Sequence, residues 1–313
     1  MKIIDLLKRY KPVHWLYNIF NAKQLKHNSI AYQQFDLDKP LFSSISSKDF
    51  PDKTSKAWLD LENSNELVEN TIGFKKFPTD IQIELKNWSD NGFLIWKQFF
   101  NEKEIDAINK EVEAIEASGN VKVTHDNKLP FLNKQSLLIK NISENKTLLE
   151  LLGFILGKEV IPFQTLNFIK GSGQRAHSDS IHMTTFPLGY LIAVWVALED
   201  IDPESGPLFY YPGSHQLPYL LNNDFGNISN AWMLGNKKYS DYEDVIEDLI
   251  NKKMMQPKVF LPKKGDILVW HANLLHGGLP IINSACTRKS MVIHYYAKDV
   301  IKYHEITERP SLL

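Results

Sequence analysis

The chain has 313 residues, 43% hydrophobic and 12% aromatic, enough to bury a substantial core. Its 36 Lys and Arg residues nearly balance 37 Asp and Glu residues, which argues against nucleic acid as a partner because phosphate binding needs a basic excess. A single cysteine, Cys286, excludes an intrachain disulfide and predicts a reducing compartment, most simply the cytoplasm. The sequence predicts no membrane span, because no apolar run reaches 18 residues, and its charged start does not resemble a signal peptide.

The first 75 residues differ from the rest and are expected to form a helical or irregular extension. Residues 2–26 combine six basic with four aromatic residues, and their apolar positions recur at helical spacing with a break at Pro12. One interpretation is a helical arm packed on the main domain. The other is that residues 1–30 lie on an anionic membrane surface, which would place the protein peripherally at the inner face of a membrane. Residues 38–70, rich in Pro, Ser and Asp, are expected to cross the surface as a long loop.

Residues 76–313 are expected to form one mostly β domain with flanking helices. Helices are predicted near residues 80–90, from Asn101 to about Ala117, and over 145–156, with a strand at Phe93–Trp96. From residue 159 short β runs separated by Gly and Pro turns predict a jelly roll rather than a parallel α/β sheet. Residues 217–256 interrupt this pattern with a probable helix over 241–252, and an insertion of that size is often a lid or a binding loop.

Two separated motifs carry the residues of a metal site. His177 and Asp179 are two apart, so on a strand they would share one face, and His276 follows about a hundred residues later. Two histidines and one carboxylate on one face of octahedral Fe(II) leave three positions open, enough for a bidentate 2-oxo acid and O2. Arg288 then offers the bidentate fork that the far carboxylate of 2-oxoglutarate needs, and Ser290 on the same strand face adds a hydroxyl.

Neighbouring histidines leave alternatives open. His182 follows the first motif closely and His271 precedes His276, so either is an alternative ligand. His215 is expected to pack or to form a hydrogen bond within a turn. Without Arg288, the same residues would suit a metal-dependent cupin that uses no oxo acid.

From about residue 93 to 300 the chain resembles the phytanoyl-CoA dioxygenase family of Fe(II)- and 2-oxoglutarate-dependent oxygenases. The resemblance rests on five blocks in matching order and spacing: HSD, AVWVALEDI, SGPLFYYPGSH, KGDILVWHANLLHGG and TRKSMVIHYY. It implies a double-stranded β-helix, the jelly-roll form that cupins share. It also implies that His177, Asp179 and His276 ligate Fe(II) as the catalytic centre, and that Arg288 binds the cosubstrate 2-oxoglutarate.

The resemblance implies further positions and shows two departures. Trp195 occupies a position that faces the active site, and the strand with Gln164 and Leu166 on one face matches one that walls the cosubstrate. Gly278 stands where some relatives carry a serine that helps to bind the oxo acid. The first 75 residues match no part of the family pattern.

The implied activity is hydroxylation of an unactivated C–H bond in a small organic substrate. Related halogenases have a small residue at the position of Asp179, so the carboxylate predicts hydroxylation. A lipid or acyl substrate is favoured by the basic, aromatic N-terminus and by aromatic residues near the predicted pocket or insertion, namely Phe186, Tyr190, Phe209, Tyr210, Tyr211 and Trp232. The alternatives are a polar metabolite or amino acid as substrate, and a jelly-roll binding module without catalysis. The sequence does not indicate an oligomeric state.

Overall fold

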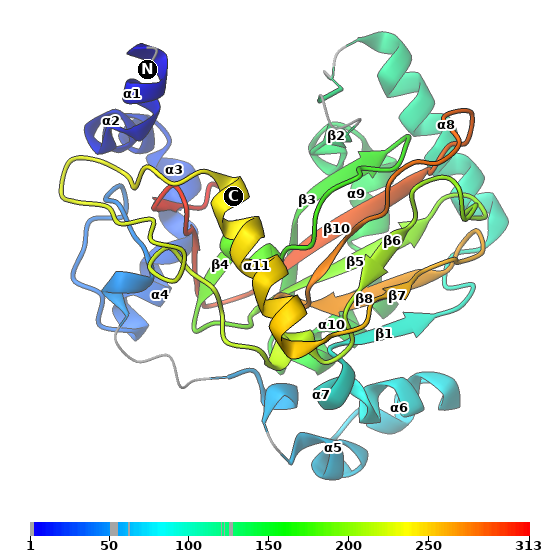
Figure 1. Cartoon of the computed structure of the whole chain (residues 1–313). Coiled ribbons are helices and arrows are strands. Elements are labelled where there is room, and N and C mark those ends of the chain that lie inside the picture. The colour runs from blue at the N-terminus through cyan, green and yellow to red at the C-terminus, as the bar shows by residue number, and fades with distance from the viewer. Residues whose placement is uncertain (1–2, 51–55, 62, 120, 122, 125–127) are drawn as a thin grey trace.

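A computed structural model describes residues 3–50, 56–61, 63–119, 121, 123–124 and 128–313 (Figure 1). Its strands are β1 (Phe93–Trp96), β2 (Lys128–Pro130), β3 (Val160–Phe168), β4 (Thr184–Phe186), β5 (Leu191–Ala197), β6 (Leu208–Tyr210), β7 (Lys258–Val259), β8 (Ile267–His271), β9 (His276–Gly278), β10 (Ser290–Ala297), β11 (Ile301–His304) and β12 (Arg309–Pro310). The main sheet has six antiparallel strands in the order β1-β8-β5-β10-β3-β2, and the smaller sheets have the orders β7-β6-β9 and β12-β11-β4.

Side-chain alternation explains how the main sheet separates its two faces. On β10, Val292 packs toward the barrel interior, whereas Met291 and Ile293 pack against the helices outside. The central strand β5 is buried at every position, because helices cover one face and the barrel interior lies on the other. Its uninterrupted apolar sequence is therefore what a strand covered on both faces requires.

The sheet β7-β6-β9 packs across the interior from the main sheet, sharing a core that includes Trp195, Trp270 and Leu208. Its edge is extended by an antiparallel bridge in which the backbones of His177 and His276 exchange hydrogen bonds of 2.9 and 3.0 Å. Two facing antiparallel sheets with flanking helices form the predicted jelly roll, so the expected fold class is confirmed.

The described helices are α1 (Ile3–Arg9), α2 (Lys11–Phe20), α3 (Ala22–Leu25), α4 (Ser29–Gln34), α5 (Ser64–Leu67), α6 (Thr79–Lys86), α7 (Trp88–Asn91), α8 (Glu102–Ser118), α9 (Leu137–Ser143), α10 (Lys146–Leu156) and α11 (Tyr239–Lys253). Helix α8 begins with the predicted capping box, since Asn101 and Glu104 bond each other's backbone N–H, and it ends at Gly119 with φ 66°. The apolar sides of α6 to α10 contribute to the outer core against the main sheet. None of the described helices is long and apolar enough to cross a bilayer.

The N-terminal segment packs on two different parts of the barrel. Helices α1 to α4 lie beside β4, away from the helix layer (Figure 1). Tyr32 and Phe50 share a core with Ile301 and Tyr303 of β11. The chain then joins the outer core through residues 57–77, so both described parts of the expected extension are built onto the barrel. Within the predicted surface crossing, residues 51–55 and 62 lie outside the described residues.

Candidate metal centre

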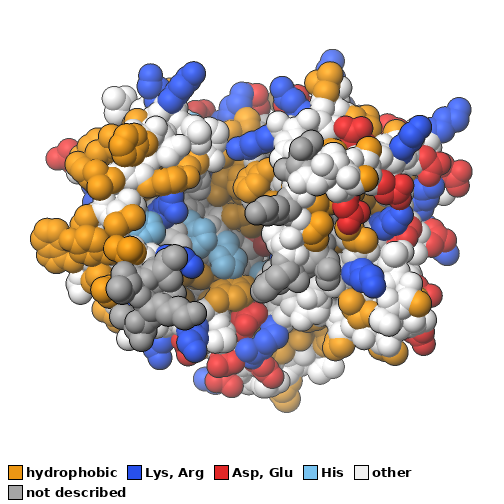
Figure 2. Space-filling model, turned by 90° about the horizontal axis from the view of Figure 1, so that it is seen from above, with side chains coloured by type: hydrophobic (Ala, Val, Ile, Leu, Met, Phe, Trp, Pro, Cys, Tyr) orange, Lys and Arg blue, Asp and Glu red, His pale blue; other side chains and the backbone are white. Residues whose placement is uncertain are grey.

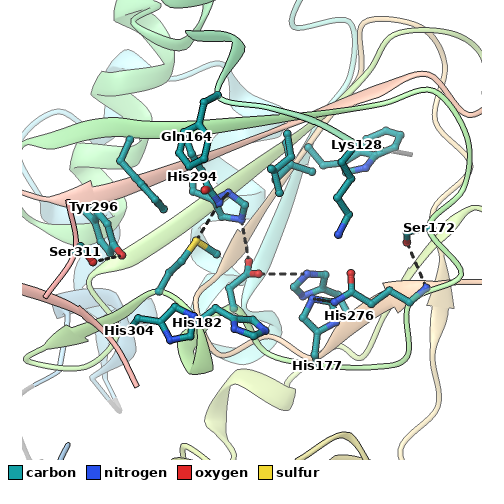
Figure 3. Close-up of a pocket in the computed structure, with 18 of the residues that line it drawn as sticks. Lys128, Gln164, Ser172, His177, His182, His276, His294, Tyr296, His304 and Ser311 are labelled. Atoms are coloured by element: carbon teal, nitrogen blue, oxygen red, sulfur yellow. Dashed lines mark hydrogen bonds and ion pairs between the residues drawn. The ribbon is translucent and has the colours of Figure 1, made fainter. Parts of the chain in front are cut away.

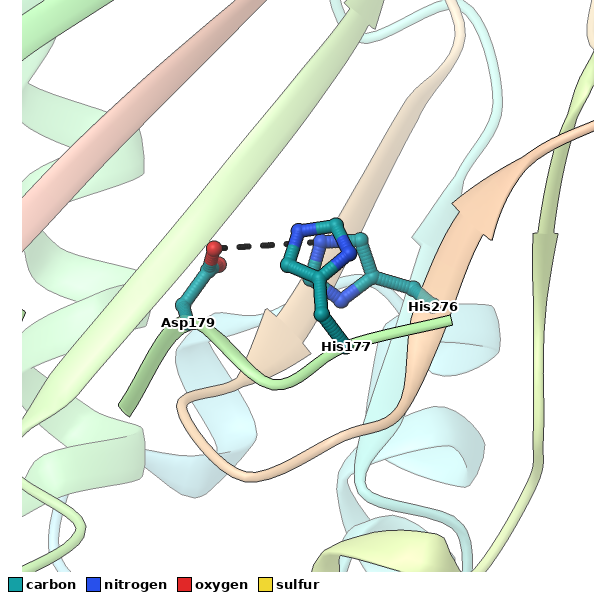
Figure 4. A group of neighbouring side chains, drawn as sticks. All are labelled: His177, Asp179 and His276. Carbon is teal, nitrogen blue, oxygen red and sulfur yellow. Dashed lines mark ion pairs between the residues drawn. The ribbon is translucent and has the colours of Figure 1, made fainter. Parts of the chain in front are cut away.

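Three buried side chains converge at one end of the barrel. One ligand atom from each of His177, Asp179 and His276 lies within 4.8 Å of the other two (Figure 4). Asp179 Oδ1 lies 3.8 Å from Nε2 of His276. The two ligand residues of the HSD motif do not share the face of one strand, because His177 forms an isolated β-bridge and Asp179 begins a 3₁₀ turn, η7 (Asp179–Ile181). Between them, Ser178 donates its backbone N–H to Tyr242 Oη and its hydroxyl to the Ala272 carbonyl.

Hydrogen bonds fix which nitrogen of each histidine faces the centre. His177 Nδ1 lies 2.9 Å from the carbonyl oxygen of Arg175, and His276 Nδ1 lies 3.0 Å from that of Leu274. A carbonyl only accepts, so both Nδ1 atoms carry hydrogen and both Nε2 lone pairs are available to a metal. The Gln174 amide donates to Nε2 of His177 at 3.3 Å, a bond that a metal would replace. Burial lowers the pKa of His177 to about 3, which keeps the ring neutral, as a ligand must be.

The carboxylate of Asp179 is held by two donors that the sequence reasoning missed. Trp270 Nε1 donates to Oδ2 at 2.9 Å, and His294 Nε2 lies 3.5 Å from the same oxygen. Gln164 donates to Nδ1 of His294 at 3.1 Å, which leaves the hydrogen on Nε2, facing Asp179 (Figure 3). Burial alone would raise the pKa of Asp179, but the imidazoles of His276 and His294 hold it well below its usual value. Asp179 is thus an oriented carboxylate with Oδ1 free for a metal.

Arg288 is a buried cation that lacks a carboxylate partner among the described residues. Its side chain is 2% exposed, donates one hydrogen bond of 3.2 Å to the Gly206 carbonyl and lies over the ring of Phe168. Its Nε has no hydrogen-bond partner, and neither has the buried hydroxyl of Ser290. Burial lowers the pKa of Arg288 to about 10, so it stays charged near neutral pH. An arginine in this state is suited to receive a carboxylate from a ligand.

A cavity of about 740 Å³ joins the three ligand residues to Arg288. Gln164, Leu166 and Trp195 line it, whereas Ser290 is buried without being among its lining residues. Asp179 is the one carboxylate among the described lining residues, so the cavity is predominantly basic. From above, the cavity appears as a hollow with histidine side chains in it (Figure 2).

The three further histidines considered from the sequence have three different surroundings. His182 lines the cavity but lies outside the three-residue cluster, and it packs against His304 (Figure 3). His271 instead binds Asp60, with Nε2 3.0 Å from Oδ2. His215 packs against His271 and binds the carbonyl of Ser89, as expected for a residue of a turn. The structure therefore favours His177 and His276 over their two alternatives.

The aromatic residues that the sequence places near the pocket or the insertion do not form the wall of the cavity. None of the six aromatics named from the sequence lines the cavity; Phe186 instead stacks on Phe50, and Trp232 is 64% exposed at the surface. Other aromatic side chains line the cavity, from β3, β5, β8, β10, α2, α11 and the segment after β2: Phe163, Phe168, Trp195, Trp270, Tyr296, Tyr17, Tyr239 and Phe131. Proximity in sequence to a motif does not determine whether a side chain points into the cavity.

Helix α11 of the predicted insertion lies over the segments that carry the ligands (Figure 1). Tyr242 and Ile246 of this helix share a core with Ile181 and Leu275, which flank Asp179 and His276. Tyr239, at its first turn, lines the cavity. This part of the insertion therefore both supports the centre and contributes to its wall.

A protein-family model described as phytanoyl-CoA dioxygenase matches residues 88–290, more than half of the chain. The chain belongs to the phytanoyl-CoA dioxygenase family. The predicted resemblance is thereby confirmed, and the matched span contains all three residues of the cluster, together with Arg288 and Ser290.

Curated relatives within the phytanoyl-CoA dioxygenase family match shorter stretches. Phytanoyl-CoA dioxygenase domain-containing protein 1 of Danio rerio is 32% identical over 106 residues, which cover 32% of this chain and 31% of that protein. Peroxisomal phytanoyl-CoA dioxygenase of Rattus norvegicus is 32% identical over 133 residues, covering 42% of this chain and 35% of that protein. The matches therefore span about a third of the length of each relative.

Solved structures share the fold of this phytanoyl-CoA dioxygenase family member. The α-ketoglutarate-dependent carbocyclase SnoK from nogalamycin biosynthesis aligns with a TM-score of 0.60 at 12% identity, covering 76% of this chain and 89% of SnoK. EctD from S. alaskensis, solved with 2-oxoglutarate and 5-hydroxyectoine, aligns with a TM-score of 0.53 at 19% identity, covering 67% of this chain and 73% of EctD. At these identities the likeness shows the fold alone.

Proposed function

We propose that this protein is an Fe(II)- and 2-oxoglutarate-dependent dioxygenase that hydroxylates a small organic substrate. The observation that carries the proposal is the convergence of two imidazoles and one carboxylate in a cavity that also contains a buried guanidinium without a carboxylate partner among the described residues. His177, Asp179 and His276 would hold the iron, and Arg288 would bind the far carboxylate of the oxo acid. A non-catalytic binding module would have no need of both features.

The residues present fit both groups. The three ligand residues offer two nitrogens and one oxygen, a donor set that suits ferrous iron and leaves room for a chelating oxo acid. When bound, iron and 2-oxoglutarate supply the oxidising chemistry, in which O2 is consumed, succinate and CO2 are formed and a C–H bond is hydroxylated. Trp270 and His294 would fix the carboxylate ligand, and the lining of the cavity would limit access of water. Structures of the neighbours SnoN and EctD with iron or 2-oxoglutarate bound support this assignment.

We further propose that the substrate carries an apolar chain and an acidic group. Phe131, Phe163 and Met183 contribute apolar surface to the cavity, while Lys128 and Arg309 add positive charge to its lining. An acidic lipid or acyl compound matches this combination. A polar metabolite or an amino acid is the second candidate, favoured by the ring nitrogens that His182 and His304 bring to the same wall.

The decisive experiment is stepwise loading of the protein. Anaerobic protein, Fe(II) and 2-oxoglutarate should together give the weak visible charge-transfer band of the chelate, and admission of O2 should produce succinate. Asp179→Ala should lose both signals, because the metal loses its only anionic protein ligand. Absence of both the band and succinate from the unaltered protein would favour the binding module. A metal site without Arg288-dependent binding of 2-oxoglutarate would favour a cupin that uses no oxo acid.

A further inference from the structure

The N-terminal helices expose more large apolar side chains than a helical arm packed on a barrel requires. Nine such side chains within residues 6–20 are more than a third exposed, and Phe20 reaches 86%. Figure 2 shows them as an extended hydrophobic area over α1 and α2. Contiguous apolar surface of this kind marks a site of interaction with another molecule or a membrane.

A loop before α11 enlarges this area. Ile228 and Trp232 are 63% and 64% exposed. The loop is fastened beside the helices because the backbone N–H of Lys11 donates to the Trp232 carbonyl at 2.9 Å, and because Tyr10 forms a β-bridge with Met233. We call residues 6–20 together with Ile228 and Trp232 the N-terminal apolar surface.

The N-terminal apolar surface borders the entrance of the catalytic cavity. Tyr17 belongs to this surface and also lines the cavity. The guanidinium of Arg309, another lining residue, lies 4.6 Å from the centre of the Tyr17 ring. Figure 2 shows the hydrophobic area directly beside the hollow that contains the histidines. A membrane or another molecule that binds this surface would therefore lie at the entrance of the cavity.

The charge of the N-terminal residues indicates which kind of partner the N-terminal apolar surface binds. Residues 1–30 contain six Lys and Arg residues and a single acidic residue, Asp5. Among the basic residues, Lys8, Lys23 and Lys26 are exposed beside the apolar side chains. Exposed lysines around Trp, Tyr and Leu side chains are typical of helices that lie at a lipid–water interface, where the apolar groups enter the bilayer and the cations meet anionic headgroups. A second copy of the chain would instead bring two positively charged surfaces together.

We propose that the N-terminal apolar surface docks on an anionic phospholipid bilayer and presents the cavity entrance to it. The bilayer would then supply the acidic lipid or acyl substrate directly to the cavity. That delivery rests on the proposed function, whereas docking itself requires neither iron nor 2-oxoglutarate.

Co-sedimentation of the full chain with vesicles tests the proposal. We expect binding to vesicles of phosphatidylcholine with 30 mol% phosphatidylserine, and much weaker binding to pure phosphatidylcholine or in 0.5 M NaCl. Phe20→Glu should weaken binding to the anionic vesicles at least tenfold, because it places a charge where an exposed ring enters the bilayer. Ile72→Glu, at another highly exposed apolar residue outside this surface, is the matched control and should bind like the unaltered chain.

The outcomes are separable. No sedimentation with anionic vesicles, or equal binding of the Phe20→Glu and Ile72→Glu variants, overturns the proposal. Self-association of the chain in solution that Phe20→Glu abolishes, without vesicle binding, also overturns it in favour of an interface between copies. Loss of succinate formation with normal vesicle binding would instead refute the proposed function and leave the docking surface intact. Both variants should retain the charge-transfer band, since neither residue lines the cavity.

Discussion

Replacing Arg288 with methionine separates ligand binding from folding. The guanidinium is buried and its pKa falls from 12.5 to about 10, which at about 1.36 kcal/mol per pKa unit corresponds to roughly 3 kcal/mol of lost solvation. A bound carboxylate would recover a comparable amount, because hydrogen bonds between charged groups contribute about 1.5–3 kcal/mol each. We therefore expect Arg288→Met to raise the Kd for 2-oxoglutarate roughly 100-fold, since about 1.4 kcal/mol corresponds to a factor of ten.

The same substitution should leave the empty protein nearly as stable. Methionine needs no solvation when buried, and the main loss is the hydrogen bond to the Gly206 carbonyl, about 1 kcal/mol. The Kd is measured by anaerobic titration of the charge-transfer band, and the free energy of unfolding by urea without the oxo acid. The control is Lys289→Met, which removes a neighbouring charge that pairs with Glu113 at the surface. A change in Kd below fivefold, or a loss of stability above about 3 kcal/mol, would refute the anion-binding role.

Two further predictions follow from the hydrogen bonds and from burial. Trp270→Phe keeps an aromatic ring but removes the donor to Asp179, so Fe(II) affinity measured by calorimetry should fall about 10- to 100-fold, and unchanged affinity would show that this bond does not position the ligand. Burial lowers the pKa of His27 to about 4. Between pH 6.5 and 4 only the unfolded chain takes up this proton, so His27 should make the free energy of unfolding decrease as pH falls through that range, by up to about 1.4 kcal/mol per pH unit, with no contribution above 6.5. Urea unfolding at several pH values measures the slope, which His27→Gln should reduce by up to that amount; a slope unaffected by that substitution would contradict the assignment.

Local sequence patterns predicted the elements well where the physical cause was itself local. The capping box at Asn101 and Glu104 and the left-handed Gly119 define α8 within one stretch of chain. Side-chain alternation along the segment that leads into β10 also predicted that Arg288 and Ser290 point to the same face of the sheet. The same alternation places His294 on that side, so this residue could have been found from the sequence by counting in steps of two from Arg288.

The donors to Asp179 and the turn that carries it depend on strand register and long-range contacts, which residue spacing along the chain does not predict. Strand pairing aligns Trp270 of β8 and His294 of β10 on either side of Ala193 of β5. This alignment places both hydrogen-bond donors beside the carboxylate of Asp179, which comes from a distant loop. The 3₁₀ turn at Asp179 likewise depends on Tyr242 from α11, 63 positions later. Hydrogen bonds between such distant residues have no local sequence signal.

The sequence by itself determined the chemical inventory: two histidines, a carboxylate and an arginine in an order and spacing shared with one oxygenase family, on short strands that require a partner sheet. Only the tertiary structure decided that these groups meet, which donors orient them, and that the basic, aromatic N-terminal helices lie at the entrance of the cavity. The physical reason is that periodicity and caps act over a few residues, whereas convergence arises from strand register and from packing of segments that are hundreds of residues apart.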